Sequence, residues 1–224
     1  MTRSLAPLPL WTLLLVACSP SPSGREDAAN TPDVGADAVV LEADAGAGEG
    51  DAPSVLDAPS ACTAPTAPYG AAVGDTFAGF NLPRCGGEPY VFYEGGYCEA
   101  EHTATVVIFS ALWCTVCQSE SSRVDEEITD PYGARGVRVV QVLVDGTTPG
   151  RAVDATGCQD WDDTFELDAE VLYDTDDLTF VHYPEATFPV TLVVDADGVI
   201  RFRDVHGGAG LSGLAAALDS VLAE

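Results

Sequence analysis

The sequence contains no lysine, and its only basic side chains are nine arginines, set against 36 aspartates and glutamates, for a formal net charge of -27. A chain so poor in positive charge repels phosphate backbones and anionic lipid headgroups. Nucleic-acid binding and electrostatic attachment to a membrane surface are therefore not expected. Hydrophobic residues still make up 46% of the chain, which is too many for wholly disordered protein and predicts a packed core.

Cysteine, in contrast, is abundant: there are seven in 224 residues. That number indicates an oxidising compartment, a metal site or redox chemistry. It is also odd, so at least one cysteine must lie outside any set of pairs within the chain.

The first residues resemble a bacterial lipoprotein signal peptide. Arg3 precedes an apolar stretch, 5–17, that is shorter than the ~20 residues needed to span a bilayer. It ends in Leu-Val-Ala-Cys, which is similar to a lipobox and implies cleavage before Cys18 and lipid attachment there. The resemblance implies an exported protein anchored to the cell-envelope bilayer through Cys18, and Ser19 favours the outer membrane. The alternative is an ordinary signal peptide followed by an incidental cysteine.

Residues 18–60 are rich in Ala, Asp, Gly and Pro, and no aromatic residue occurs between Trp11 and Tyr69. Such a segment buries too little apolar surface to offset its ordering entropy, so we expect a disordered acidic tether. Residues 61–224 then form a single domain. This part holds 27 of the acidic side chains and seven of the arginines, so its own net charge is -20.

The domain begins its regular structure with short β-rich segments. Residues 80–82 and 90–93 predict a leading β-hairpin, and the apolar run 105–109 predicts a buried central strand. A helix is expected to follow it to about Thr129, where Asp130-Pro131 should end it. Residues 137–144 predict a second buried strand.

The second half of the domain predicts a hairpin and a helix. Residues 190–194 and 199–202 flank an Asp-Gly turn, and leucines repeat at helical spacing over 211–222. The acid-rich stretch 160–177 is interpreted as a helical insertion with a solvated acidic face rather than a calcium loop. The expected fold class is α/β, with a central mixed sheet flanked by helices.

Three motifs in this order resemble the thioredoxin superfamily, specifically the exported TlpA/ResA-type thiol-disulfide oxidoreductases. The first is Trp113-Cys-x-x-Cys directly after a buried strand. The second is Thr187-Phe188-Pro189 before the penultimate strand, and the third is the hairpin with its turn at 195–198. The resemblance covers residues 73–222 and implies a thioredoxin-like fold.

The resemblance implies that Cys114 is the nucleophile and Cys117 the resolving thiol, with no cofactor other than this redox-active pair. A cysteine at a helix start is favoured as a thiolate by free backbone N–H groups and the helix dipole. Glu120 occupies the position of a family glutamate and is assigned a proton-handling role. The alternative for Glu120 is a solvated helix residue.

The same resemblance assigns substrate binding to Trp113, Phe188 and Pro189, with a cis peptide bond before Pro189. The expected partners are protein thiols and disulfides, together with an upstream electron donor that the sequence does not identify.

The sequence departs from thioredoxins proper in ways that favour a reductant over an oxidant. A buried Asp expected six residues before the first cysteine is replaced by Ile108. Thr115-Val116 between the cysteines contains neither the His typical of strong oxidants nor Gly-Pro. No cation adjoins Cys114, and neighbouring acids oppose thiolate formation.

Three other functions are considered. A copper carrier would combine the cysteine pair with His182, and a non-catalytic binding module would keep the pair as a structural disulfide. A peroxiredoxin would need a Thr three residues before its reactive cysteine, where this chain has Ala111. A zinc site is not expected because no other cysteines or histidines have matching spacing.

Four cysteines remain, and they permit three pairings. Cys85 and Cys98 flank the leading hairpin, so we expect them to pair, which leaves Cys62 with Cys158. Both bonds are expected to be structural.

Overall fold

The computed structural model describes residues 63–94, 97–98, 101–184 and 187–223, all within one compact unit, Ser54–Glu224. The expected signal peptide, the lipidated Cys18, the tether and Cys62 lie outside the described residues. Among the helices described, none has both the length and the apolar composition that crossing a bilayer requires.

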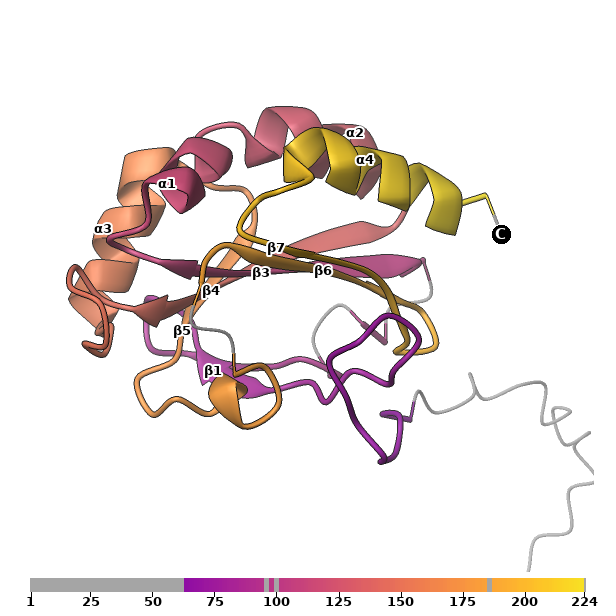
Figure 1. The fold of residues 1–224 in the computed structure, drawn as a ribbon, viewed down its shortest axis with the longest axis horizontal. Helices are drawn as coiled ribbons and strands as arrows, with labels where there is room; N and C mark the ends of the chain where they lie inside the picture. Colours follow the sequence, from indigo (N-terminus) through magenta and orange to yellow (C-terminus); the bar gives the residue numbers. More distant parts are fainter. Residues whose placement is uncertain (1–62, 95–96, 99–100, 185–186, 224) are drawn as a thin grey trace, which may run out of the picture. The chain divides into compact units, whose positions relative to one another are not determined.

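A five-stranded mixed sheet forms the centre of this unit (Figure 1). Its strands, in spatial order, are β5 (Glu170–Tyr173), β4 (Val137–Asp145), β3 (Ala104–Ala111), β6 (Val190–Asp195) and β7 (Ile200–Val205). The central strand β3 pairs in parallel with β4 and antiparallel with β6. All eight residues of β3 are buried, as its continuous apolar run predicts.

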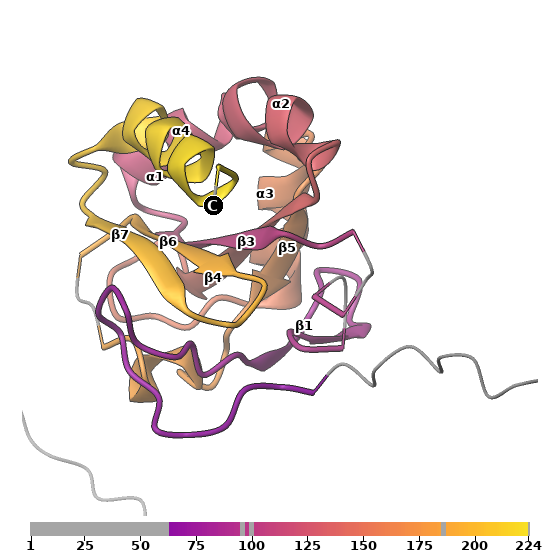
Figure 2. The same cartoon turned by 90° about the vertical axis from the view of Figure 1, so that its right-hand side faces the viewer.

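Alternate residues of β3 pack against different layers, because successive side chains of a strand point to opposite faces. Val106 and Ile108 belong to a core shared with the buried leucines of helix α4 (Gly210–Val221). Val107 and Phe109 belong to the other core, which includes Phe77. Figures 1 and 2 show α4 on one side of the sheet and the leading segment on the other.

The predicted hairpins and final helix are confirmed. Strands β1 (Asn81–Pro83) and β2 (Pro89–Val91) pair antiparallel, as do β6 and β7. The turn between β6 and β7 is stabilised by Asp195, whose Oδ1 accepts hydrogen bonds from the N–H groups of Asp197 and Val199. Gly198 has φ +78°, a conformation that glycine adopts without strain.

The helix after the CxxC is shorter and more interrupted than expected. It consists of α1 (Thr115–Ser121), a π-helical turn η1 (Asp125–Thr129) and a short α2 (Asp130–Gly133). Pro131 therefore lies inside the first turn of α2 and does not end the helical segment. The helical hydrogen bonding of η1 runs up to Asp130, whose N–H donates to the Asp125 carbonyl, and Pro131 follows with no N–H of its own to place.

The acid-rich stretch contains a strand that was not predicted. Helix α3 (Ala155–Phe165) is followed by the edge strand β5 and a 3-10 turn η2 (Thr179–Val181). The prediction of a solvated acidic face is wrong for Asp174, which is only 1% exposed. Its carboxylate accepts hydrogen bonds from the backbone of Leu178 and from the backbone and hydroxyl of Thr179, so it shapes the loop after β5.

The predicted pairing of the structural cysteines is wrong. Cys85 forms a disulfide with Cys158, with Cα atoms 5.1 Å apart. The turn that carries Cys85 lies along β5, where Arg84 forms a bridge to Leu172, and α3 packs on the same strand and brings Cys158 there. Cys98 is also disulfide-bonded, but its partner is not among the other described cysteines.

Candidate active site

The two cysteines of the CxxC motif lie where β3 passes into α1. Cys114 is the N-cap residue of α1, and its sulfur accepts a hydrogen bond from the backbone N–H of Cys117 at 3.1 Å. The two sulfurs are joined in a disulfide, and they are nearly covered, with 4% and 1% of the two residues exposed. The first turn of α1 thus directs the N–H group of Cys117 at the Cys114 sulfur, and in a reduced pair such a donor would favour the thiolate form of Cys114.

Trp113 is held by the end of β4. Its indole N–H donates to Asp145 Oδ2 at 3.0 Å, and the same oxygen accepts the backbone N–H of Gly150. The Trp113 ring meets Phe188 edge-on at a centroid distance of 6.1 Å. Two of the predicted substrate-binding residues, which are 75 positions apart in the sequence, are therefore in contact range.

The peptide bond between Phe188 and Pro189 is cis, as the resemblance implied. Pro189 lies close to the CxxC helix, because both border Gly207 in the loop before α4. A Cβ placed on Gly207 would lie 3.0 Å from Val116 Cγ1, 3.5 Å from Pro189 Cγ and 2.8 Å from Glu120 Oε1. Gly207 also has φ +62°.

Gly207 is a site residue that the sequence analysis missed. Only glycine fits this close approach and this backbone conformation without displacing its neighbours. The signal was present in the glycine-rich sequence Gly207-Gly208-Ala-Gly between the last strand and the last helix.

Glu120 is buried, with 6% of the residue exposed, so the alternative of a solvated helix residue is wrong. Burial raises the pKa of its carboxyl group above the ordinary value, and the negative charge of Asp204 adds to this effect. Asp204 is on β7, and its carboxylate accepts the backbone N–H of Ala209 at 3.0 Å. Two carboxylates, those of Glu120 and Asp204, therefore flank the glycine loop that borders the CxxC helix.

The raised pKa of Glu120 makes the stability of the fold depend on pH. The charged form is disfavoured in the folded state, so folding stability falls as the pH rises from the ordinary value of 4.5 through the higher folded value. Glu120→Gln removes that charge, and its unfolding free energy should exceed that of the wild type at pH 7 and match it near pH 4. Urea unfolding at a series of pH values measures the difference, and Glu126→Gln, at an exposed position, is the control.

The AhpC/TSA family model matches residues 73–203, more than half of the chain. The chain belongs to the AhpC/TSA family. No curated protein sequence matches it.

Solved structures confirm that this AhpC/TSA chain has the expected thioredoxin-like fold. One from Chlorobium tepidum, described as a thiol:disulfide interchange protein DsbE, is 19% identical with a TM-score of 0.56, covering 67% of this chain and 98% of that one. The thioredoxin domain of a thiol-disulfide oxidoreductase from Bacteroides vulgatus is 14% identical, with a TM-score of 0.55 and coverages of 68% and 99%. Peroxidoxin BcpB from Mycobacterium tuberculosis is 16% identical, with a TM-score of 0.51 and coverages of 67% and 94%.

A buried polar cluster lies next to the CxxC helix of this AhpC/TSA chain. Gln141, on β4 opposite Ile108, is 2% exposed. Its side-chain amide forms hydrogen bonds with Ser110 on β3, Ser121 on α1 and Trp161 on α3, at distances of 2.8–3.3 Å. Gln141 therefore links both helices to the sheet. The sequence analysis did not find it because a lone Gln in a valine-rich strand carries no motif.

His182 is exposed at the end of η2, where its ring meets Tyr69 edge-on at 5.9 Å. Within the part of the family chain that the structure describes, no three His, Cys, Asp or Glu side chains are grouped so that they could hold a metal ion.

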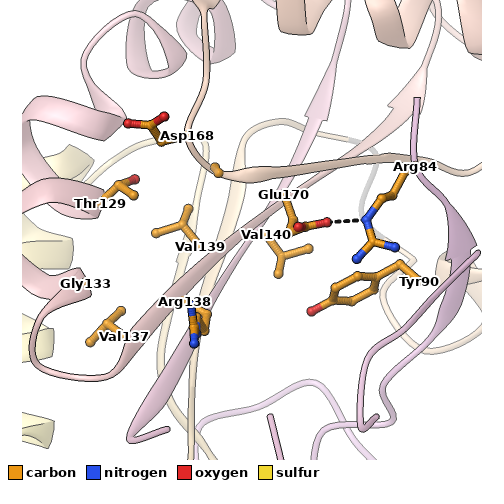
Figure 3. Close-up of a pocket in the computed structure, with 11 residues that line it drawn as sticks. Arg84, Tyr90, Thr129, Gly133, Val137, Arg138, Val139, Val140, Asp168 and Glu170 are labelled. Carbon is orange, nitrogen blue, oxygen red and sulfur yellow. Dashed lines mark hydrogen bonds and ion pairs between the residues drawn. The ribbon is translucent and has the colours of Figure 1, made fainter. Parts of the chain in front are cut away.

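A cavity of about 300 Å³ opens at the end of the sheet away from the CxxC, beside the first residues of β4 (Figure 3). Arg84 and Glu170 form an ion pair across it at 2.6 Å, and the guanidinium of Arg84 stacks over Tyr90. None of the residues that line it is a cysteine or a histidine. This cavity therefore offers no thiol or imidazole group, and the CxxC motif lies at the opposite end of the sheet.

Proposed function

We propose that the protein is a thiol-disulfide oxidoreductase of the TlpA/ResA type that reduces disulfides in exported proteins. The observation that carries the proposal is the arrangement of Cys114 and Cys117 at the start of α1, beside cis-Pro189 and the buried Glu120. A nucleophilic thiolate, a resolving thiol within bonding distance and a proton acceptor are the groups that disulfide exchange requires.

The reaction starts from the reduced pair. The Cys114 thiolate attacks one sulfur of a substrate disulfide, forms a mixed disulfide and expels the other substrate sulfur as a thiolate, which takes up a proton. Cys117 then loses its proton, attacks the Cys114 sulfur and releases the second substrate thiol. Two electrons pass to the substrate, and the chain is left with the Cys114–Cys117 disulfide. A dithiol protein upstream reduces it again.

Glu120 is proposed to accept the proton of Cys117. It lies on the same helix, one turn beyond Cys117, and its buried position keeps it away from bulk water. Its raised pKa brings the carboxylate closer in basicity to a thiol, which favours proton transfer. Trp113, Phe188 and Pro189 form the adjoining surface for the substrate chain.

We also propose that the N-terminal signal peptide directs export and lipid attachment. A lipid on Cys18 and a tether over residues 18–60 would hold the domain at the cell envelope, at the outer membrane if Ser19 acts as a sorting signal. Disulfide exchange with exported proteins fits such a location, because disulfides persist in oxidising compartments.

A peroxidase is the second candidate, since the family and one solved neighbour include proteins of that kind by name. The position three residues before Cys114 is Ala111, however, and it supplies no hydroxyl to polarise a peroxide. The site therefore favours a disulfide, rather than a peroxide, as the substrate that oxidises the cysteine pair.

The test presents the reduced protein with insulin and, separately, with hydrogen peroxide. We expect the protein to catalyse insulin reduction when dithiothreitol regenerates its dithiol. We expect its rate of peroxide consumption to be at least ~100-fold below that of a dedicated peroxidase. Alkylation with mass mapping in glutathione buffers should show reversible titration of Cys114 and Cys117. A pair that resists reduction, or one that retains copper after dialysis, would support a binding module instead.

A further inference from the structure

A groove lies beside the CxxC, and its walls come from three separate segments. Trp113 precedes Cys114, Phe188 precedes cis-Pro189, and Phe180 belongs to η2. The remaining walls come from Asp145 and the loop after β4 and from Asp177. This cavity, called here the Trp113 groove, encloses about 480 Å³, within the ~300–1,000 Å³ range typical of ligand pockets.

The groove has an aromatic wall. The ring of Phe188 meets those of Trp113 and Phe180 at centroid distances of 6.1 and 6.5 Å, both edge-on. Two apolar residues within two positions of Phe180 in the chain, Leu178 and Val181, are 53% and 76% exposed, although neither lines the groove itself.

The groove also carries negative charge. Asp145 uses one oxygen to hold Trp113, while the Asp177 carboxylate is exposed and forms no hydrogen bond or ion pair with another described residue. One arginine, Arg151, lies in the loop after β4, between two residues of the groove lining. Four others pair with acids elsewhere, namely Arg84, Arg123, Arg135 and Arg201.

We propose that the Trp113 groove binds a lysine or arginine side chain of the substrate polypeptide, next to the cysteine that Cys114 attacks. This inference rests on the proposed function and adds the class of substrate. A basic side chain combines an apolar stem, which packs on aromatic rings, with a charged end that carboxylates attract. A basic side chain therefore matches both the aromatic wall and the aspartates of the groove.

The test uses synthetic peptides that each hold one cysteine as a mixed disulfide with mercaptoethanol. Two peptides have the same composition, with a single arginine either adjacent to the cysteine or seven residues from it. The reduced protein should react about tenfold faster with the first at low salt, and the ratio should shrink in ~0.5 M salt because screening weakens the contact.

Single substitutions distinguish the effect of the groove on the rate ratio from the effect of the domain's overall negative charge. Asp177→Asn should lower the ratio about threefold, while Asp176→Asn, an exposed neighbour outside the groove lining, should leave it unchanged. Asn suits position 177, where φ is +55°. Phe180→Ala should also lower the ratio, since it removes part of the aromatic wall.

Equal rates for the two peptides would overturn the inference, as would equal effects of the two Asn variants. A neutral small disulfide, hydroxyethyl disulfide, separates this failure from that of the proposed function. If the protein reduces the small disulfide but does not discriminate between the peptides, only the inference is wrong. If it reduces neither, both are wrong.

Discussion

Cys114→Ser is expected to lower the rate of insulin reduction at least ~1,000-fold, because the hydroxyl that replaces the sulfur is not ionised at neutral pH and cannot form a mixed disulfide. The same change should leave the unfolding transition of the reduced protein almost unaltered, because serine is only slightly smaller than cysteine. Turbidity from precipitating insulin chains and a denaturant titration measure the two effects.

Cys117→Ser should behave differently, although its turnover is also lost. Attack by Cys114 still occurs, but no second thiol resolves the product, so a covalent adduct with the substrate accumulates. Mass spectrometry under non-reducing conditions detects the adduct, and Thr115→Ser, between the two cysteines, is the control that should stay active. Adduct formation by Cys114→Ser and not by Cys117→Ser would reverse the two assigned roles.

Removing the Cys85–Cys158 disulfide by the double change to alanine is expected to lower the unfolding free energy by about 4 kcal/mol. The bond joins residues 73 apart in the chain, and a cross-link over such a loop strongly restricts the unfolded state. Guanidinium unfolding followed by tryptophan fluorescence measures the loss, and Trp161, three residues from Cys158, reports on this region.

The matched control is Cys114→Ala with Cys117→Ala. That bond spans a separation of only three residues, so its removal should cost less than half as much. The explanation through chain entropy would fail if the two double variants lost the same stability.

The parts of the fold that the sequence predicted are those encoded by short local patterns. The run of apolar residues in β3, the valines of β4 and the Asp-Gly turn before β7 each specify a strand or a turn within a few residues. The CxxC and Phe188-Pro189 were likewise found because their motifs are contiguous.

The missed features depend on contacts between distant segments. Strand β5 has only four residues in an acid-rich stretch, and it forms by pairing with β4. The partner of Cys85 is set by how α3 packs on that strand, which no spacing of cysteines reveals. The burial of Glu120 depends on the loop at Gly207, far along the chain.

The hydrogen bonds of Gln141 limit which amino-acid substitutions the buried core beside the CxxC helix can accept. A single replacement of Gln141 by an apolar residue would leave the hydroxyls of Ser110 and Ser121 and the indole N–H of Trp161 buried without that partner. An apolar version of the same core therefore requires several substitutions at once, each harmful alone. Mutational scans should find these positions individually intolerant but jointly replaceable, while the helix that carries the CxxC keeps its place.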